Sequence, residues 1–337
     1  MRKQFIVAIA IIVTLAMLMP VASDEENCTQ TKAINETMMK SQKYIRYMIE
    51  GGSPSIEELS SALGYSVIGQ SKGSQVQLKN ITDCVYSDIT GDSINDVIVV
   101  TDITGPITNM SSGVVAVNGS DGTRLWSKSF KNCAAIVGLT TDLNGDNKND
   151  VFIFTLSIYP ERYQDKIIAV NGWNGRELWS KYLEVESLEF IEALIVYSGS
   201  LTSPNTTDLL VSILKTHLLF GTVTSEITAL NGSNGEELWS KSFRDSTAVA
   251  RPVDLTNDGK DEVVITNIRT FMSSDVIVVN GTCGTEVWRK YYRDVIIGYS
   301  AGDLTGDGAN DLAVQIGCCK LEALRGYDGK WLWTIRV

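Results

Sequence analysis

Four short acidic segments repeat along this 337-residue chain and are its clearest candidates for chemistry. In each segment, carboxylates occupy the first, fifth and ninth positions, and a run of apolar, mostly β-branched residues follows. Such spacing lets a short loop surround a hard cation with oxygen ligands, with the third side chain and a backbone carbonyl near position seven completing the set. The sequence therefore predicts four calcium loops, each joining two strands. The candidate ligands are Asp88, Asp92 and Asp96; Asp142, Asn144, Asp146 and Asp150; Asp254, Asp258 and Glu262; and Asp303, Asp307 and Asp311.

The acidic segments differ in their third residue, which is Asn144 in the second copy and threonine in the others. We expect the Asn144 loop to bind calcium most tightly, within the range of about 10⁻⁴ to 10⁻³ M that is common for extracellular calcium modules. A further copy, residues 200–208, has Ser200 and Pro204 in place of the first two carboxylates, so no metal is expected there. The competing interpretation is a set of Asx-turns whose carboxylates only cap backbone amides.

A second repeated block follows each acidic segment and ends in tryptophan. It contains an Asn-Gly step or its equivalent and a second glycine, and successive tryptophans lie 45 to 60 residues apart. Because Asn-Gly and Asp-Gly steps tolerate the positive φ angles of tight hairpins, each block is expected to form a strand, a turn and an outer strand. A large side chain repeated in register usually fills the gap between adjacent sheets, and sugar stacking is the less favoured alternative. The tryptophans are Trp126, Trp179, Trp239, Trp288 and Trp333.

The two blocks together predict an all-β, five-bladed β-propeller, since a four-stranded blade buries its faces only by stacking on neighbouring blades. The acidic blocks resemble FG-GAP and VCBS-type repeats of integrin-α-like propellers. The tryptophan blocks resemble PQQ-like repeats of quinoprotein-dehydrogenase-like propellers. These resemblances cover about residues 81–337, and they imply that the carboxylates above bind calcium. Such propellers often have seven or eight blades, whereas the blades expected here are about 81–130, 133–183, 190–243, 245–292 and 294–337.

The N-terminal residues have the features of an export signal. Arg2 and Lys3 precede an apolar run from Phe5 to Met19, and small residues follow before position 24. We expect residues 1–23 to be a cleaved signal peptide; the alternative is an uncleaved anchor, because the run is near the lower length limit for a spanning helix. Residues 24–80 are expected to form a helical segment and linker. The protein is therefore expected to be secreted or displayed at the cell surface.

Composition narrows the choice of partner and of chemistry. The formal net charge of -11 argues against nucleic-acid binding, because no basic excess remains to neutralise phosphates. His217 is the only histidine, so the chain offers few candidate residues for a Ser-His-Asp triad or a histidine-ligated metal. Export makes the six cysteines a plausible disulfide set with 15 possible pairings, and the Asn-x-Ser/Thr sequons fit a glycoprotein.

The variable connections between the second and third strands of each blade should emerge at the rim opposite the acidic loops. Their aromatic residues, arginines and methionine are types enriched at protein interfaces, although packing across the mouth of the ring is an equal alternative. We expect a non-enzymatic, calcium-stabilised module that binds a protein or glycan at the cell surface. The alternatives are an envelope assembly scaffold of the PQQ-like type and, less favoured, a quinoprotein or carbohydrate-active enzyme. The candidate contacts are Tyr159, Arg162, Tyr163, Phe220, Arg269 and Phe271.

Overall fold

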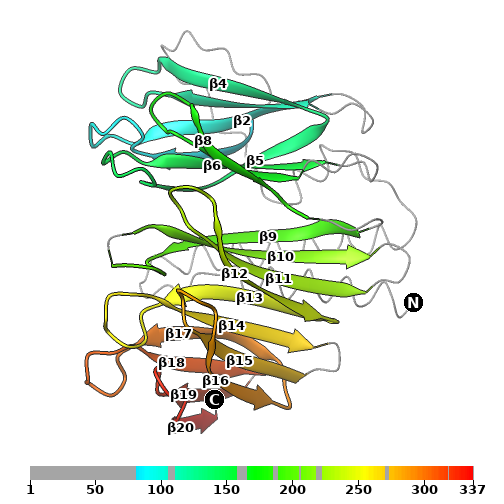
Figure 1. Cartoon of the computed structure of the whole chain (residues 1–337), viewed down its shortest axis with the longest axis vertical. Helices are drawn as coiled ribbons and strands as arrows, with labels where there is room; N and C mark the ends of the chain where they lie inside the picture. Colours follow the sequence, from blue (N-terminus) through cyan, green and yellow to red (C-terminus); the bar gives the residue numbers. More distant parts are fainter. Residues whose placement is uncertain are drawn as a thin grey trace.

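The computed structural model describes residues 81–104, 111–157, 165–184, 189–204, 206–217, 222–269, 273–317 and 319–336. Twenty strands form five antiparallel sheets of four strands, and the strands of each sheet lie in sequence order (Figure 1). The predicted all-β fold of five propeller blades is therefore confirmed. The expected signal peptide and helical N-terminal segment lie outside these residues. Within the described ranges, no helix has the length and apolar character needed to cross a membrane.

We number the five sheets as blades 1 to 5 in sequence order. Blades 1 and 2 are built from β1 (Ile81–Ser87), β2 (Asp96–Thr104), β3 (Ser111–Val117) and β4 (Arg124–Lys131), then β5 (Cys133–Thr141), β6 (Asp150–Ser157), β7 (Lys166–Val170) and β8 (Glu177–Tyr182). Blade 3 is built from β9 (Glu189–Gly199), β10 (Asp208–His217), β11 (Val223–Leu230) and β12 (Glu237–Arg244). Blades 4 and 5 are built from β13 (Ser246–Val253), β14 (Glu262–Arg269), β15 (Ser273–Val279) and β16 (Glu286–Tyr292), then β17 (Ile296–Gly302), β18 (Asp311–Ile316), β19 (Lys320–Leu324) and β20 (Trp331–Arg336).

The acidic loop and the Asn-Gly turn of each blade lie together at one end of the sheet, which we call the loop rim. The ninth carboxylate of the loop joins them: in blade 1, Asp96 accepts hydrogen bonds from the backbone N–H of Ile89 (3.0 Å) and of Gly119 (2.9 Å). Asp150 of blade 2 makes the same two kinds of contact, and all five ninth-position carboxylates are buried. The opposite end, where the second and third strands are connected, is the far rim.

The two glycines of each tryptophan block have different roles, and the expected positive φ occurs at the second glycine, which in blades 2 and 3 belongs to an Asn-Gly step. A Cβ on Gly232, the first glycine of blade 3, would lie 1.8 Å from the Thr207 carbonyl oxygen. The first glycine is therefore required by close backbone approach. It is the second glycine, Gly235, that adopts a positive φ of 74°, a conformation that glycine reaches without a Cβ clash.

Consecutive blades are joined by one repeated interface in which the tryptophan is central. The indole Nε1–H of Trp126, Trp179, Trp239 and Trp288 donates to the carbonyl of the first glycine in the next blade, at 2.6 to 2.7 Å. In blades 1 to 4, the apolar second residue of the loop packs against the same turn, as Leu143 does against Gly232. The predicted packing role of the repeated tryptophan is thus confirmed for blades 1 to 4.

The blades form an open arc across the described residues. Four large apolar clusters each join two consecutive blades, from blades 1 and 2 through to blades 4 and 5. No such cluster joins blade 5 to blade 1 in the ranges described. Figure 1 shows the reason, because the sheets are stacked along the long axis and the first and last sheets lie at opposite ends.

Candidate functional site

The four acidic loops share one backbone conformation, in which the fourth and sixth residues are left-handed. In blade 2 these are Gly145 and Asn147, with φ of 78° and 63°. The carboxylate of Asp142 accepts a hydrogen bond from the backbone N–H of each, at 2.7 and 2.8 Å. Blades 1, 4 and 5 have the same pair of left-handed residues and the same contacts to the first carboxylate. The first carboxylate therefore stabilises the turn, because it accepts hydrogen bonds from two backbone N–H groups that would otherwise be unpaired.

The remaining ligand candidates of blade 2 lie close to one another. Asp146 accepts from the backbone N–H of Lys148 (3.0 Å), and the Asn144 amide donates to Asp150 (3.2 Å). Burial raises the pKa of Asp150 to about 6, although the N–H groups that it accepts from act in the opposite direction, and the negative charges of Asp146 and Asp142 raise it further. This loop thus concentrates carboxylate charge around one buried acid, and a bound cation would relieve the repulsion.

The donor chemistry of these loops suits calcium, which prefers carboxylate and amide oxygens. Oxygens that accept one N–H keep a second lone pair for a metal. However, the described residues contain no group of three or more histidine, cysteine, aspartate or glutamate side chains placed to hold a metal ion. The contacts found are those of the Asx-turn interpretation. Calcium binding stays a prediction, and it would require the first and fifth carboxylates to turn toward a common centre.

The degenerate loop of blade 3 separates the structural from the metal-binding role of these acids. Asp208, its only retained carboxylate, accepts hydrogen bonds from the backbone N–H and the hydroxyl of Thr202 (2.9 and 2.6 Å). It also accepts one from the N–H of Gly232 (3.4 Å). The ninth carboxylate therefore holds the acidic loop against the Asn-Gly turn by hydrogen bonds, even in a blade where no calcium is expected. The ninth carboxylates of blades 1, 2 and 5 have the same structural role.

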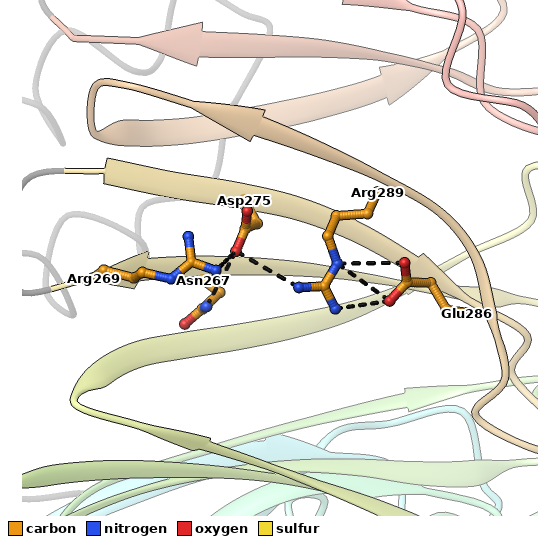
Figure 2. Close-up of polar contacts among 5 residues, drawn as sticks. All are labelled: Asn267, Arg269, Asp275, Glu286 and Arg289. Atoms are coloured by element: carbon orange, nitrogen blue, oxygen red, sulfur yellow. Dashed lines mark hydrogen bonds and ion pairs between the residues drawn. The ribbon is translucent and has the colours of Figure 1, made fainter.

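Only Arg269 of the six predicted partner contacts lies among the described residues; Tyr159, Arg162, Tyr163, Phe220 and Phe271 lie outside them. Arg269 ends β14 at the far rim and forms an ion pair with the buried carboxylate of Asp275. Figure 2 shows Asp275 between Arg269 and Arg289, whose guanidinium lies 3.9 Å away, with Asn267 beside it. Arg289 also binds Glu286 at 2.7 Å. Arg269 is thus anchored within blade 4 but still partly exposed.

Two exposed tyrosines at the far rim were missed by the sequence analysis. Tyr182 of β8 is 56% exposed and has the Lys166 ammonium 4.1 Å from its ring centre. Tyr291 of β16 is 55% exposed and has the Arg269 guanidinium 5.8 Å from its ring centre. Both tyrosines follow the repeat tryptophan by three residues. Since side chains alternate along a strand, that spacing places them on the opposite, solvent-facing side and could have revealed them.

Cys133 and Cys283 do not support the expected disulfide set. Cys133 is a buried thiol and Cys283 an exposed one, and neither forms a disulfide. Burial raises the pKa of Cys133, which makes it a poor nucleophile. Cys28 and Cys318 lie outside the described residues.

The sheets, turns and tryptophan interfaces define a β-propeller with PQQ-like repeats. Residues 96–295, more than half of the chain, match the PQQ_2 family, described as outer membrane protein assembly factor BamB, and the chain belongs to this family. This match supports the PQQ-like part of the sequence resemblance, whereas the FG-GAP and VCBS part stays a resemblance. No curated protein matches the chain.

Solved structures with a similar fold are distant in sequence. Sqt1 from Saccharomyces cerevisiae is 12% identical with a TM-score of 0.43, over 77% of this chain and 63% of that one. The quinohemoprotein alcohol dehydrogenase ADHIIG from Pseudomonas putida is 15% identical with a TM-score of 0.39, over 78% and 43%. BamB from Moraxella catarrhalis is 12% identical with a TM-score of 0.28, over 72% and 73%. The chain therefore spans less than two thirds of Sqt1 and of the dehydrogenase.

Proposed function

We propose that this chain is a non-enzymatic, protein-binding scaffold of the cell envelope or cell exterior, and that its partner docks on the far rim. Membership of a family described as an assembly factor supports a scaffold over an adhesion module. The observation that carries the choice of surface is the pair of exposed tyrosines, Tyr182 and Tyr291, each beside a cation. Tyrosine and arginine are the residue types that most often dominate binding energy at protein interfaces.

The far rim suits this role better than the loop rim. At the loop rim, the first, fifth and ninth carboxylates of the acidic loops are already hydrogen-bonded to backbone N–H groups of their own blades. At the far rim, Lys166 and Arg269 hold the tyrosine rings in place, so that less side-chain freedom is lost when a partner binds. A partner that presents apolar and acidic groups would match these two cation and aromatic pairs.

Replacing both Tyr182 and Tyr291 with alanine is expected to weaken partner binding at least about 10-fold, because aromatic anchors at interfaces are often worth 2 kcal/mol or more. The measurement is quantitative cross-linking and mass spectrometry of envelope and extracellular proteins captured by the full chain. The matched control is Trp173→Ala, which removes an exposed ring that lies 4.5 Å from the Lys148 ammonium at the loop rim. If the Trp173→Ala control lost binding while the double variant kept it, the partner would dock at the loop rim. That result would contradict the proposal.

We further propose that the four acidic loops bind calcium in the folded state. Their shared conformation and the crowding of carboxylates in blade 2 support this proposal. Because only the folded state would bind, each site filled at about 100 times its Kd would add about 2.7 kcal/mol. Calcium is therefore expected to raise the melting temperature, and excess chelator to lower it.

Asp146→Asn is expected to reduce the calcium-induced rise in melting temperature, as measured by differential scanning calorimetry. Asp121→Asn is the control, because it removes the same charge from an exposed aspartate that caps Thr123 in an Asn-Gly turn. A melting temperature that changes neither with calcium nor with chelator would refute the calcium proposal and leave the scaffold proposal intact.

A further inference from the structure

A crevice of about 320 Å³ lies between blades 2 and 3. The hydroxyls of Thr228 and Ser240 line it. A volume of this size is near the lower end of the range for small-molecule sites, whose walls are mostly apolar with a few polar groups. The crevice therefore suits a small ligand with an apolar body. Its apolar wall is built from buried aliphatic side chains of both blades: Ile167, Leu183, Val211, Ile213 and Leu230.

The repeat explains why space is left at this interface. Four residues after the repeat tryptophan, blades 1, 3 and 4 have an aromatic ring: Phe130, Phe243 and Tyr292. Each ring packs into the apolar cluster that joins its blade to the next one. Blade 2 has Leu183 at the same repeat position. Because leucine is smaller than an aromatic ring, it leaves unfilled part of the space that a ring occupies in the other blades.

Charged side chains complete the lining of the crevice. They are the carboxylates of Glu184, Glu226 and Glu237 and the ammonium group of Lys181. Lys181 forms an ion pair with Glu237 across the interface (3.0 Å), and the buried Lys215 forms one with Glu226 (2.6 Å). Even when Lys215 is included, three carboxylates face two ammonium groups. A crevice with this charge attracts a cation and disfavours an anion.

Glu184 is the carboxylate that accounts for the imbalance. It has no ion pair within the part of the chain that the structure describes, and it is exposed. It directly follows Leu183, the residue that leaves the space. One added ammonium group would balance the charges of the crevice. An ammonium group has three N–H donors and no acceptor, so it also matches the carboxylate and hydroxyl oxygens of the lining.

We propose that the crevice between blades 2 and 3 binds a primary alkylammonium group, supplied by a free aliphatic amine or by a lysine side chain. The methylene chain would contact the apolar wall between Ile167 and Ile213, and the ammonium group would pair with Glu184. Burying the methylenes supplies favourable energy that an exposed ion pair alone does not. This proposal does not rest on the scaffold proposal, and its failure would leave that one intact.

The first test is an NMR titration of the full chain with labelled isoleucine methyl groups. Pentylamine is expected to shift the Ile167 and Ile213 signals with a Kd of about 1 mM or tighter, and 1-pentanol, which has the same chain without the charge, to bind more weakly. Lysine capped at both ends is the second probe. Binding of pentylamine alone would identify a free amine as the ligand, and binding of the capped lysine would identify a side chain. Binding of neither amine, or equal binding of amine and alcohol, would overturn the proposal.

Two variants place the ligand within the crevice. Leu183→Phe introduces the ring found in the other blades, so it is expected to weaken amine binding at least about 10-fold while the melting temperature stays the same or rises. Glu184→Gln removes the proposed counter-ion without breaking an ion pair of the described residues, and about 2- to 5-fold weaker binding is expected.

The matched control is Glu177→Gln, which removes the same charge from an exposed glutamate that does not line the crevice. Its amine affinity is expected to equal that of the wild type. Unchanged binding in both Leu183→Phe and Glu184→Gln would show that the amine binds elsewhere and would overturn the proposal. The same is true if Glu177→Gln weakens binding as much as Glu184→Gln, because the effect would then come from overall charge.

Discussion

Replacing Trp239 with alanine is expected to lower the free energy of unfolding by about 3 to 5 kcal/mol, the usual cost of truncating a large buried aromatic. The ring lies between blades 3 and 4 at 8% exposure, and its Nε1–H donates to the Gly281 carbonyl at 2.6 Å. The substitution would leave both a cavity and an unpaired carbonyl. Chemical denaturation followed by circular dichroism measures the loss.

The control for this prediction is Trp333→Ala, at the same repeat position in blade 5. Because that ring is 37% exposed and no sheet of the described residues packs on it, its removal is expected to cost less than about 1 kcal/mol in the monomer. Equal losses for the two variants would mean that both rings are buried to the same extent, which contradicts an open fifth blade.

Gly232→Ala is the second substitution with a large expected effect, a loss of about 3 kcal/mol or more through overpacking. The added Cβ would lie 1.8 Å from the Thr207 carbonyl oxygen and 3.1 Å from Leu143 of the preceding blade. The turn would have to move, and the hydrogen bond from Trp179 to the Gly232 carbonyl, now 2.7 Å, would move with it. One methyl group is therefore expected to disturb both the blade and its interface.

Gly298→Ala provides the matched control, because a Cβ there meets no atom within 4 Å and the residue has no positive φ. Its effect on the free energy of unfolding is expected to stay within about 0.5 kcal/mol. A comparable loss at both glycines would contradict close approach as the reason for glycine at position 232, because backbone entropy alone makes a Gly→Ala change stabilising.

The sequence predicts the blades and their turns well, because the signals for them are local. Each acidic segment, each Asn-Gly step and each tryptophan recurs in register, and the strands on either side follow from hairpin geometry. The partners of these residues are harder to predict. Asp96 binds Gly119, 23 residues away, and Trp126 binds Gly172 in the next blade. The sequence therefore predicts Asp96 as a calcium ligand, and the structure adds a contact between loop and turn that the local pattern does not reveal.

The exposed features required the three-dimensional structure for a different reason. Leu304 and Trp333 match their buried counterparts in type and repeat position, but they are accessible because no other sheet of the described residues packs on this side of blade 5. Ile335 and Trp331 did carry a signal, because they replace charged residues of the other blades. Tyr182 and Tyr291 lie on outer strands, away from the connections in which a binding surface was expected.

Hydroxyl-radical footprinting of the repeat tryptophans tests the central claim most directly, namely that one interface joins the blades four times and is left open at blade 5. The full chain is labelled at a dilution where it is monomeric, and oxidation is measured at each tryptophan by mass spectrometry. We expect Trp333 to be oxidised several-fold faster than Trp126, Trp179 and Trp239, in line with their exposure. Equally slow oxidation of all four in the monomer would contradict the open arc.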